Sequence, residues 1–220
     1  MNGIAGDVAT LEIVRRPLRV SMVRGPVARF PWVAVLLAAS VVVTAVATNA
    51  YLHEIPASLG ARWSTGWPAL RAGRWWTLAT SLVLTRDRFM AATMPICLGG
   101  VLALYERRAG HVRTVAVAVV GHAVGTVLLS VAFAPLALTG APMLVKAASN
   151  LDYGGSMAIA AGCGALAARL RDDRFTLLVA AITLLALPMH HQMADWGHFV
   201  AVPLGFATDR IALRAHTRRP

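Results

Sequence analysis

Apolar residues form long stretches along the chain, and short basic segments separate these stretches. Six stretches are candidate membrane spans, because several of them approach or exceed the roughly 20 residues that an α-helix needs to cross a bilayer. They cover residues 31–51, 88–105, 114–136, 154–170, 175–189 and 195–213. The last three are shorter or more polar than the first three. The pattern therefore predicts an all-α, polytopic membrane protein with six transmembrane helices.

The charges between these stretches predict their orientation. With six spans, every second connecting segment lies on the same side of the membrane as the N-terminus. Fifteen of the 21 Lys and Arg residues fall in the segments on this side. These segments are 1–30, 106–113, 169–174 and 209–220. Because positive residues accumulate in cytoplasmic loops, both termini are predicted to be cytoplasmic. The chain then divides into a basic tail (1–30), a membrane domain (31–213) and a second basic tail (214–220).

Composition agrees with a membrane protein and excludes other classes. Hydrophobic residues make up 57% of the chain and charged residues 14%, too little polar surface for a soluble domain of this length. The net charge of +11 follows from the basic loops, and no basic run is interleaved with aromatic residues as nucleic-acid binding requires. The apolar run after the basic tail is too long for a signal peptide. Cys97 and Cys163 lie in apolar runs and are interpreted as free thiols.

A long outer loop, residues 52–87, differs from the other connections. It contains four of the six tryptophans, namely Trp63, Trp67, Trp75 and Trp76. Tryptophan is enriched at membrane–water interfaces, so we expect this loop to lie on the outer leaflet or partly in it. The loop is either an ordinary interfacial anchor or an element that shapes access to a site.

Two polar residues inside the predicted spans lie at one depth. Ser156 precedes Arg169 by 13 residues, and His198 precedes Arg210 by 12. With a rise of about 1.5 Å per residue, both lie roughly 18 to 20 Å above the inner-side charges of parallel helices. A hydroxyl and an imidazole at one level are the minimum for a serine nucleophile with a general base.

Small residues surround both positions and admit two interpretations. Gly154 and Gly155 precede the serine, while Gly197, Ala201 and Gly205 form a stripe on the last span. Small residues let membrane helices approach closely, which would bring a short serine within reach of an imidazole. Serine and glycine are also common packing residues in membrane helices, so packing alone remains the alternative.

Other polar residues are secondary candidates. Asp195 either orients the His198 imidazole or is the N-cap of the last helix. His122, on the third span, is interpreted as a packing histidine nearer the inner side. His190 and His191 supply too few ligands for a metal site, and neither a metal nor a cofactor is predicted.

These features together resemble the rhomboid family of intramembrane serine proteases. The family's serine motif reads Gly154-Gly155-Ser156 here, and its histidine motif reads DWGHFVAVPLGFA around His198. The stretch AGRWWTLATSLVL (72–84), with Trp76, matches the start of the family's second helical region, which ends here at Glu106. The resemblance covers residues 72–213.

The resemblance implies a six-helix fold and a function. Ser156 would attack the scissile carbonyl of a transmembrane substrate, and His198 would serve as base and then acid. Transmembrane segments of membrane proteins would enter laterally from the lipid bilayer, between the second and fifth helices. Trp76, Glu106 and Gly205 would have structural roles. The protein would be a multi-pass protein of a bacterial plasma membrane, without nucleic acid or a small-molecule cofactor as partner.

Departures from the family pattern keep a second function open. Met90 and Met94 stand where the family has the histidine and asparagine that donate to the oxyanion, and a thioether cannot donate. Met157 replaces the glycine after the serine. Thr77 replaces an arginine, which leaves Arg74 as the candidate tie between the outer loop and Glu106. The alternative is therefore a catalytically inactive rhomboid-like protein that binds transmembrane helices through the same groove.

Overall fold

The computed structural model describes residues 30–142, 145, 149, 151–186 and 193–217, and the regular elements within these ranges are helices. The long helices are α1 (Trp32–Ala47), α5 (Arg88–Ala109), α6 (His111–Val119), α7 (Gly125–Ala137), α9 (Ser156–Leu170), α10 (Asp173–Ala186) and α11 (Met193–Thr217). A π-helical segment, η1 (Val120–Val124), joins α6 to α7. The outer loop forms three short helices, α2 (Ala57–Trp63), α3 (Trp67–Arg71) and α4 (Thr77–Val83).

Each predicted span overlaps a long helix, although the boundaries shift by a few residues. By length and composition, two helical runs among the described residues are suited to crossing a membrane: Arg88–Ala109 and His111–Ala137. Helices Trp32–Ala47 and Ser156–Leu170 are apolar but shorter. The all-helical fold is confirmed, whereas the six-span count and the cytoplasmic position of both termini remain predictions. The last helix continues to Thr217, past the predicted boundary at 213, because its alanines and arginines are strong helix formers.

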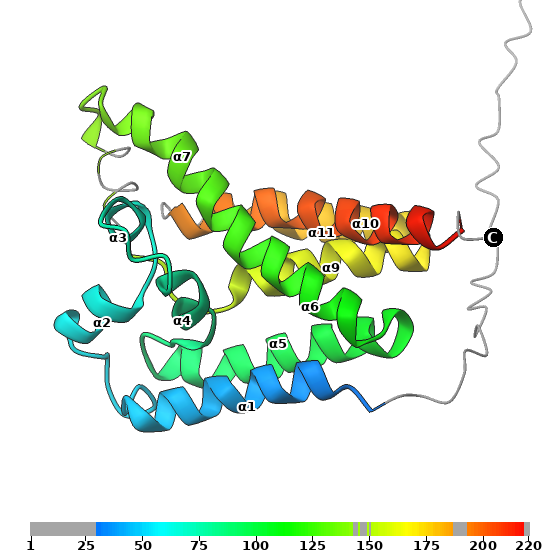
Figure 1. The fold of residues 1–220 in the computed structure, drawn as a ribbon, viewed down its shortest axis with the longest axis horizontal. Coiled ribbons are helices and arrows are strands. Elements are labelled where there is room, and N and C mark those ends of the chain that lie inside the picture. Colours follow the sequence, from blue (N-terminus) through cyan, green and yellow to red (C-terminus); the bar gives the residue numbers. More distant parts are fainter. Residues whose placement is uncertain (1–29, 143–144, 146–148, 150, 187–192, 218–220) are drawn as a thin grey trace, which may run out of the picture.

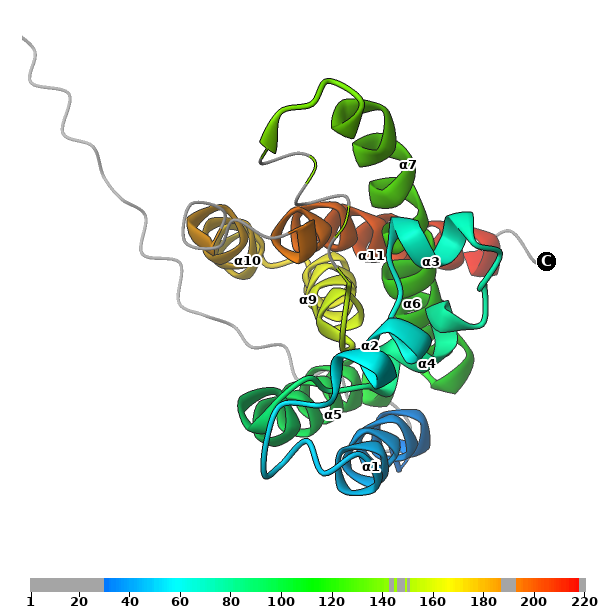
Figure 2. The same ribbon diagram turned by 90° about the vertical axis from the view of Figure 1, so that its left-hand side faces the viewer.

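Helix α9 lies at the centre of the bundle. In the end view of Figure 2, helices α5, α6, α10 and α11 surround it, and each of them contacts it. Helix α1 packs against α5 on the outside (Figure 1). The three loop helices gather at the end of the bundle where α9 begins (Figures 1 and 2). The N-terminus of α9 is therefore enclosed by long helices on its sides and by the loop at its end.

Small residues allow α9 and α11 to touch through their backbones. A Cβ atom at Gly205 would lie 1.9 Å from the carbonyl oxygen of Ala161, and one at Gly164 would lie 2.0 Å from that of Val202. Both distances are far below any van der Waals contact. Glycine at these two positions is therefore what permits the close parallel packing of the two helices.

Glu106 has a different role from the one expected. Its buried carboxylate accepts hydrogen bonds from the backbone N–H groups of Val33 (3.0 Å) and Ala34 (2.9 Å), and it pairs with His111. The side chain thus caps the start of α1, where the first N–H groups lack helical partners. Arg74, the candidate tie between the outer loop and Glu106, instead donates to the carbonyl of Ala61 within that loop.

A buried polar cluster joins three helices at the other end of the bundle from the loop helices. The hydroxyl of Tyr105 (α5) donates to Oδ1 of Asp209 (α11) at 2.7 Å, and both side chains are fully buried. Arg169 (α9) lies 3.9 Å from the same carboxylate and donates to the carbonyl of Arg108 at 2.8 Å. Buried charges need such partners, so this cluster fixes the three helices relative to one another.

Candidate active site

Ser156 is the first residue of α9 and is half-buried. The turn before it requires Gly154, whose φ of +80° is strained for any residue with a side chain. The N–H of Gly154 donates to the carbonyl of Ser81 in α4 at 2.8 Å. The loop helix α4 thus fixes the direction from which the chain enters α9.

The outer loop holds the same turn at a second point. Thr65 and Asp152 exchange backbone hydrogen bonds of 2.8 and 3.2 Å, as an isolated antiparallel bridge. Next along the chain, Tyr153 packs so closely on α2 that a Cβ at Gly60 would lie 2.3 Å from its hydroxyl oxygen. Residues 152–154 are therefore clamped between α2 and α4, which makes the loop part of the site's framework.

Asp152 is an unusual group for this position. Its side chain is 8% exposed, and burial raises its pKa to about 7. The carboxyl thus titrates near neutrality only four residues before Ser156. Sequence reasoning missed it, although a lone aspartate next to the serine motif could have signalled it.

Two methionines cover Gly154. A Cβ at this glycine would lie 2.8 Å from the terminal methyl carbon of Met90 and 2.9 Å from that of Met94. Both side chains come from α5 and bring apolar groups to the turn that leads into Ser156. Because a thioether cannot donate a hydrogen bond, Met90 and Met94 could not stabilise an oxyanion at this turn.

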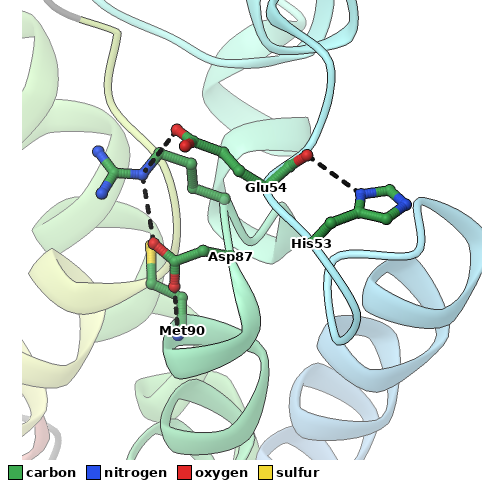
Figure 3. A network of polar contacts seen from close by, with 5 residues as sticks. His53, Glu54, Asp87 and Met90 are labelled. Carbon is green, nitrogen blue, oxygen red and sulfur yellow. Dashed lines mark hydrogen bonds and ion pairs between the residues drawn. The ribbon is translucent and has the colours of Figure 1, made fainter.

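An ion-pair network fixes the start of α5 and hence Met90. Asp87 caps the helix by accepting from the Met90 N–H at 3.0 Å (Figure 3). Arg86 lies 3.3 Å from Asp87 and 3.5 Å from Glu54, while His53 contacts the Glu54 carbonyl (Figure 3). These exposed pairs add little stability, but they tie the loop between α1 and α2 to the helix that carries the two methionines.

Met157 points into the core. It is 2% exposed, and its sulfur accepts a contact from the Thr126 hydroxyl at 3.5 Å. A Cβ at Gly125 would lie 2.5 Å from its methyl carbon, and one at Gly197 would lie 3.0 Å from its sulfur. Met157 thus fills the space between α7, α9 and α11. Its side chain therefore packs in the core and does not crowd the surface at the start of α9.

The contact between Met157 and Gly197 also relates the two predicted catalytic positions. Met157 follows Ser156 on α9, and Gly197 precedes His198 on α11. The two positions therefore lie in one layer of the bundle, on helices that pack backbone to backbone. His198 is half-buried. A direct hydrogen bond between Ser156 and His198 stays a prediction.

Three other predicted residues need comment. Asp195 lies within the described part of α11 (Met193–Thr217), so it is a helical residue and not the predicted N-cap. Its side chain lies outside the described residues, as do His190 and His191. Trp76 stands at the start of α4 and is 54% exposed, like its neighbour Trp75.

His122 does not lie where it was expected. Its buried imidazole forms a hydrogen bond of 3.0 Å, through Nε2, with the Ser81 hydroxyl of the outer loop. It is indeed a packing histidine with a partner, and it lies in the layer of the serine turn. The reason is that η1 contacts both α4 and α9 at this turn.

Sequence reasoning also missed Asp209 and Ser81. Asp209 falls within the predicted last span, and an ionisable residue inside a span is a signal of a special role. Ser81 carries no such signal, because serine is common in loops. Among the described residues, no group of three or more His, Cys, Asp or Glu side chains is placed to hold a metal ion.

Comparison with known proteins identifies a family. A family model described as "Rhomboid-like protein" matches residues 21–217. No curated protein and no solved structure matches the chain. The family match extends further toward the N-terminus than the motifs between residues 72 and 213, and it includes α1.

Proposed function

The chain belongs to the rhomboid-like protein family, and from this membership we propose that it is an intramembrane serine endopeptidase that cleaves transmembrane substrates. It is a rhomboid-like integral membrane protein, and the proposed location is a bacterial plasma membrane. Substrate segments would enter the bundle laterally from the lipid, between α5 and α10.

One observation carries the proposal: Ser156 begins the central helix, in the same layer as His198 on the helix packed closest to it. In the proposed reaction, the Ser156 Oγ forms a bond to the scissile carbonyl carbon and its proton passes to His198. The protonated imidazole then donates to the leaving amine as the peptide bond breaks. Water, activated by the same imidazole, hydrolyses the acyl-enzyme and regenerates the serine.

The start of α9 supplies oxyanion donors even without the usual side chains. The first bond of this helix runs from the Ile159 N–H to the Gly155 carbonyl, at 2.9 Å. The N–H groups of Ser156, Met157 and Ala158 precede it and have no acceptor within the helix. Backbone N–H groups at a helix start favour negative charge, so they would stabilise the oxyanion in part. We expect a slow enzyme, because two side-chain donors are replaced.

A second function has its own support, the methyl groups of Met90 and Met94 beside Gly154. Methionine surfaces adapt to many apolar partners. A rhomboid-like protein with this lining would bind transmembrane helices in the same groove without cleaving them.

Labelling with a fluorophosphonate probe separates the two functions. The purified full-length protein, in detergent and in lipid, is compared with Ser156→Ala and His198→Ala. For an activated serine, labelling of the wild type is expected and both substitutions abolish it. Ser40→Ala is the matched control, because this exposed residue on α1 lies outside the site. It should label as the wild type does.

Absence of labelling in a well-folded wild type would contradict the protease. The binding function then predicts that a photo-crosslinking amino acid at position 90 captures transmembrane segments of other proteins. A crosslinker at the exposed position 177 on α10 is the control for contacts with any passing helix.

A further inference from the structure

A chain of two hydrogen bonds leads from the third helical run to the serine turn. The His122 imidazole bonds the Ser81 hydroxyl at 3.0 Å, and the Ser81 carbonyl accepts the Gly154 N–H at 2.8 Å. Gly154 lies two residues before Ser156, in a backbone conformation that glycine adopts readily and other residues do not. The side chain of Ser81 is thus held by His122 while its backbone holds the entry to α9.

The position of His122 is itself fixed against α9. It lies in η1, and π-helical segments inside α-helices often occur at functional sites. A Cβ at Gly121 would lie 2.2 Å from the Cβ of Ala161, and one at Gly125 would lie 2.5 Å from the Met157 methyl carbon. The wider turn of η1 is therefore locked onto α9 on both sides of His122, which leaves the imidazole directed at α4.

We propose that His122 is a positioning residue for Ser156, which acts by holding Ser81 and, through it, the Gly154 turn. As far as it concerns catalysis, this inference rests on the proposed protease function. It assigns no chemical step to His122. Loss of the imidazole would free Ser81 and let the turn, and with it the Ser156 hydroxyl, shift relative to His198.

Burial excludes the other interpretation of this pair, that Ser81 is a nucleophile activated by His122. Ser81 is 0% exposed and His122 is 1% exposed, so no substrate carbonyl reaches the hydroxyl. The pair also lies behind the Gly154 turn, which the Ser81 carbonyl already binds. A hydroxyl enclosed in this way stabilises a structure and does not attack a substrate.

A double-mutant cycle on fluorophosphonate labelling tests the inference. His122→Leu and Ser81→Ala should each slow labelling of Ser156 about tenfold, since small shifts of a reacting group have large effects on rate. The double variant should be no slower than either single variant, because both remove one contact. His122→Gln should restore most of the rate, since an amide can also bond the Ser81 hydroxyl. Additive effects, or no rescue by glutamine, would overturn the proposal.

Ser130→Ala is the matched control for loss of a buried polar group. Ser130 is fully buried further along the same helical run, in α7, and its hydroxyl has no hydrogen-bond partner among the described residues. Its removal should leave the labelling rate unchanged. A tenfold loss in this variant as well would show that any buried polar deletion slows the reaction, which contradicts a specific role for His122.

A measurement without catalysis distinguishes failure of this inference from failure of the proposed function. Ser156→Cys is prepared in a background with Cys97→Ala and Cys163→Ala, and its rate of modification by a small maleimide is measured. His122→Leu should change this rate severalfold, and His122→Gln should restore it.

An unchanged rate overturns the inference even if the wild type is labelled. If fluorophosphonate does not label the wild type but the maleimide rate changes as expected, the proposed protease function is wrong and the positioning role of His122 stands. Attachment of the phosphonate to Ser81 instead of Ser156 would overturn the positioning role.

Discussion

Helices α5, α9 and α11 are held together differently at their two ends. At the end away from the loop helices α2–α4, named the inner end, their own side chains form the buried cluster of Tyr105, Asp209 and Arg169. At the end where the loop helices lie, named the outer end, α5 presents the methyl groups of Met90 and Met94 to the turn before α9. Polar ties at this end come mainly from the outer loop. The loop helices α2–α4 therefore do at the outer end what ionic side chains do at the inner end.

This difference separates the stability of the bundle from the geometry of the site. Damage to the inner cluster should destabilise the whole fold, since it leaves buried charges without partners. Damage to the loop contacts should change the site first, because backbone bonds at one turn are lost while the helices stay packed. The predictions below test this separation, from the largest expected effect to the smallest.

The largest loss of stability is expected at the close packing of α9 on α11, because both ends of the bundle depend on it. Gly205→Ala would place a Cβ 1.9 Å from the Ala161 carbonyl oxygen, a backbone atom that cannot move aside. The helices must separate, so we expect loss of monodisperse, folded protein in size-exclusion chromatography. Gly100→Ala is the control, since a Cβ there meets nothing within 4 Å. It should be neutral or stabilising by up to about 1 kcal/mol. Equal yields of both variants would contradict the packing.

Asp209→Ala tests the inner end. The substitution leaves the Tyr105 hydroxyl and Arg169 without their buried partner and should cost about 3 to 5 kcal/mol of unfolding free energy. Thermal unfolding in detergent measures this loss. Asp173→Ala removes an exposed carboxylate at the start of α10 and should cost less than about 1 kcal/mol. In Asp209→Ala, the rate of fluorophosphonate labelling of Ser156 per folded molecule should equal that of the wild type. A slower rate would show that the two ends are not separate.

Asp152→Asn tests the outer end through pH. Burial raises the pKa of Asp152 from 3.8 to about 7, so between these values the folded state holds a proton that the unfolded state has lost. Stability should therefore fall as pH rises from about 4 to about 7, and then level off. Asparagine resembles the protonated acid, and the variant should lose this part of the pH dependence of Tm, which is on the order of 10 °C for such a pKa rise. Parallel Tm curves for the variant and the wild type would contradict a buried, protonated Asp152.

Met90→His combined with Met94→Asn tests whether the methionines limit catalysis. Side-chain donors would return beside the serine turn, and one oxyanion donor contributes roughly 2.7–4 kcal/mol in a well-formed site. In this unadapted site we expect about a tenfold faster labelling by fluorophosphonate, or about 1.4 kcal/mol. Met90→Leu with Met94→Leu is the apolar control and should label as the wild type does. No gain in the polar variant would favour the binding function.

Much of the architecture could be predicted from the sequence. The apolar stretches gave the long helices, because a segment without water must satisfy its backbone hydrogen bonds internally. The motifs around Ser156 and His198 led to the family, which the match over residues 21–217 confirms. The spacing of Gly197, Ala201 and Gly205 indicated which stripe of α11 is small. In each case the information lies within one segment and follows from helical geometry.

The partners of the polar residues could not be predicted in this way. Glu106 caps α1 from 72 to 73 residues away, Tyr105 meets Asp209 across 104 residues, and Ser81 meets His122 across 41. A periodic pattern records the face and the depth of a residue on its own helix. It does not record the angle at which a second helix crosses or where a loop folds back. The sequence by itself therefore determined the helices, the family and the candidate serine and histidine. Only the tertiary structure decided what holds them, because those contacts depend on how separate segments pack.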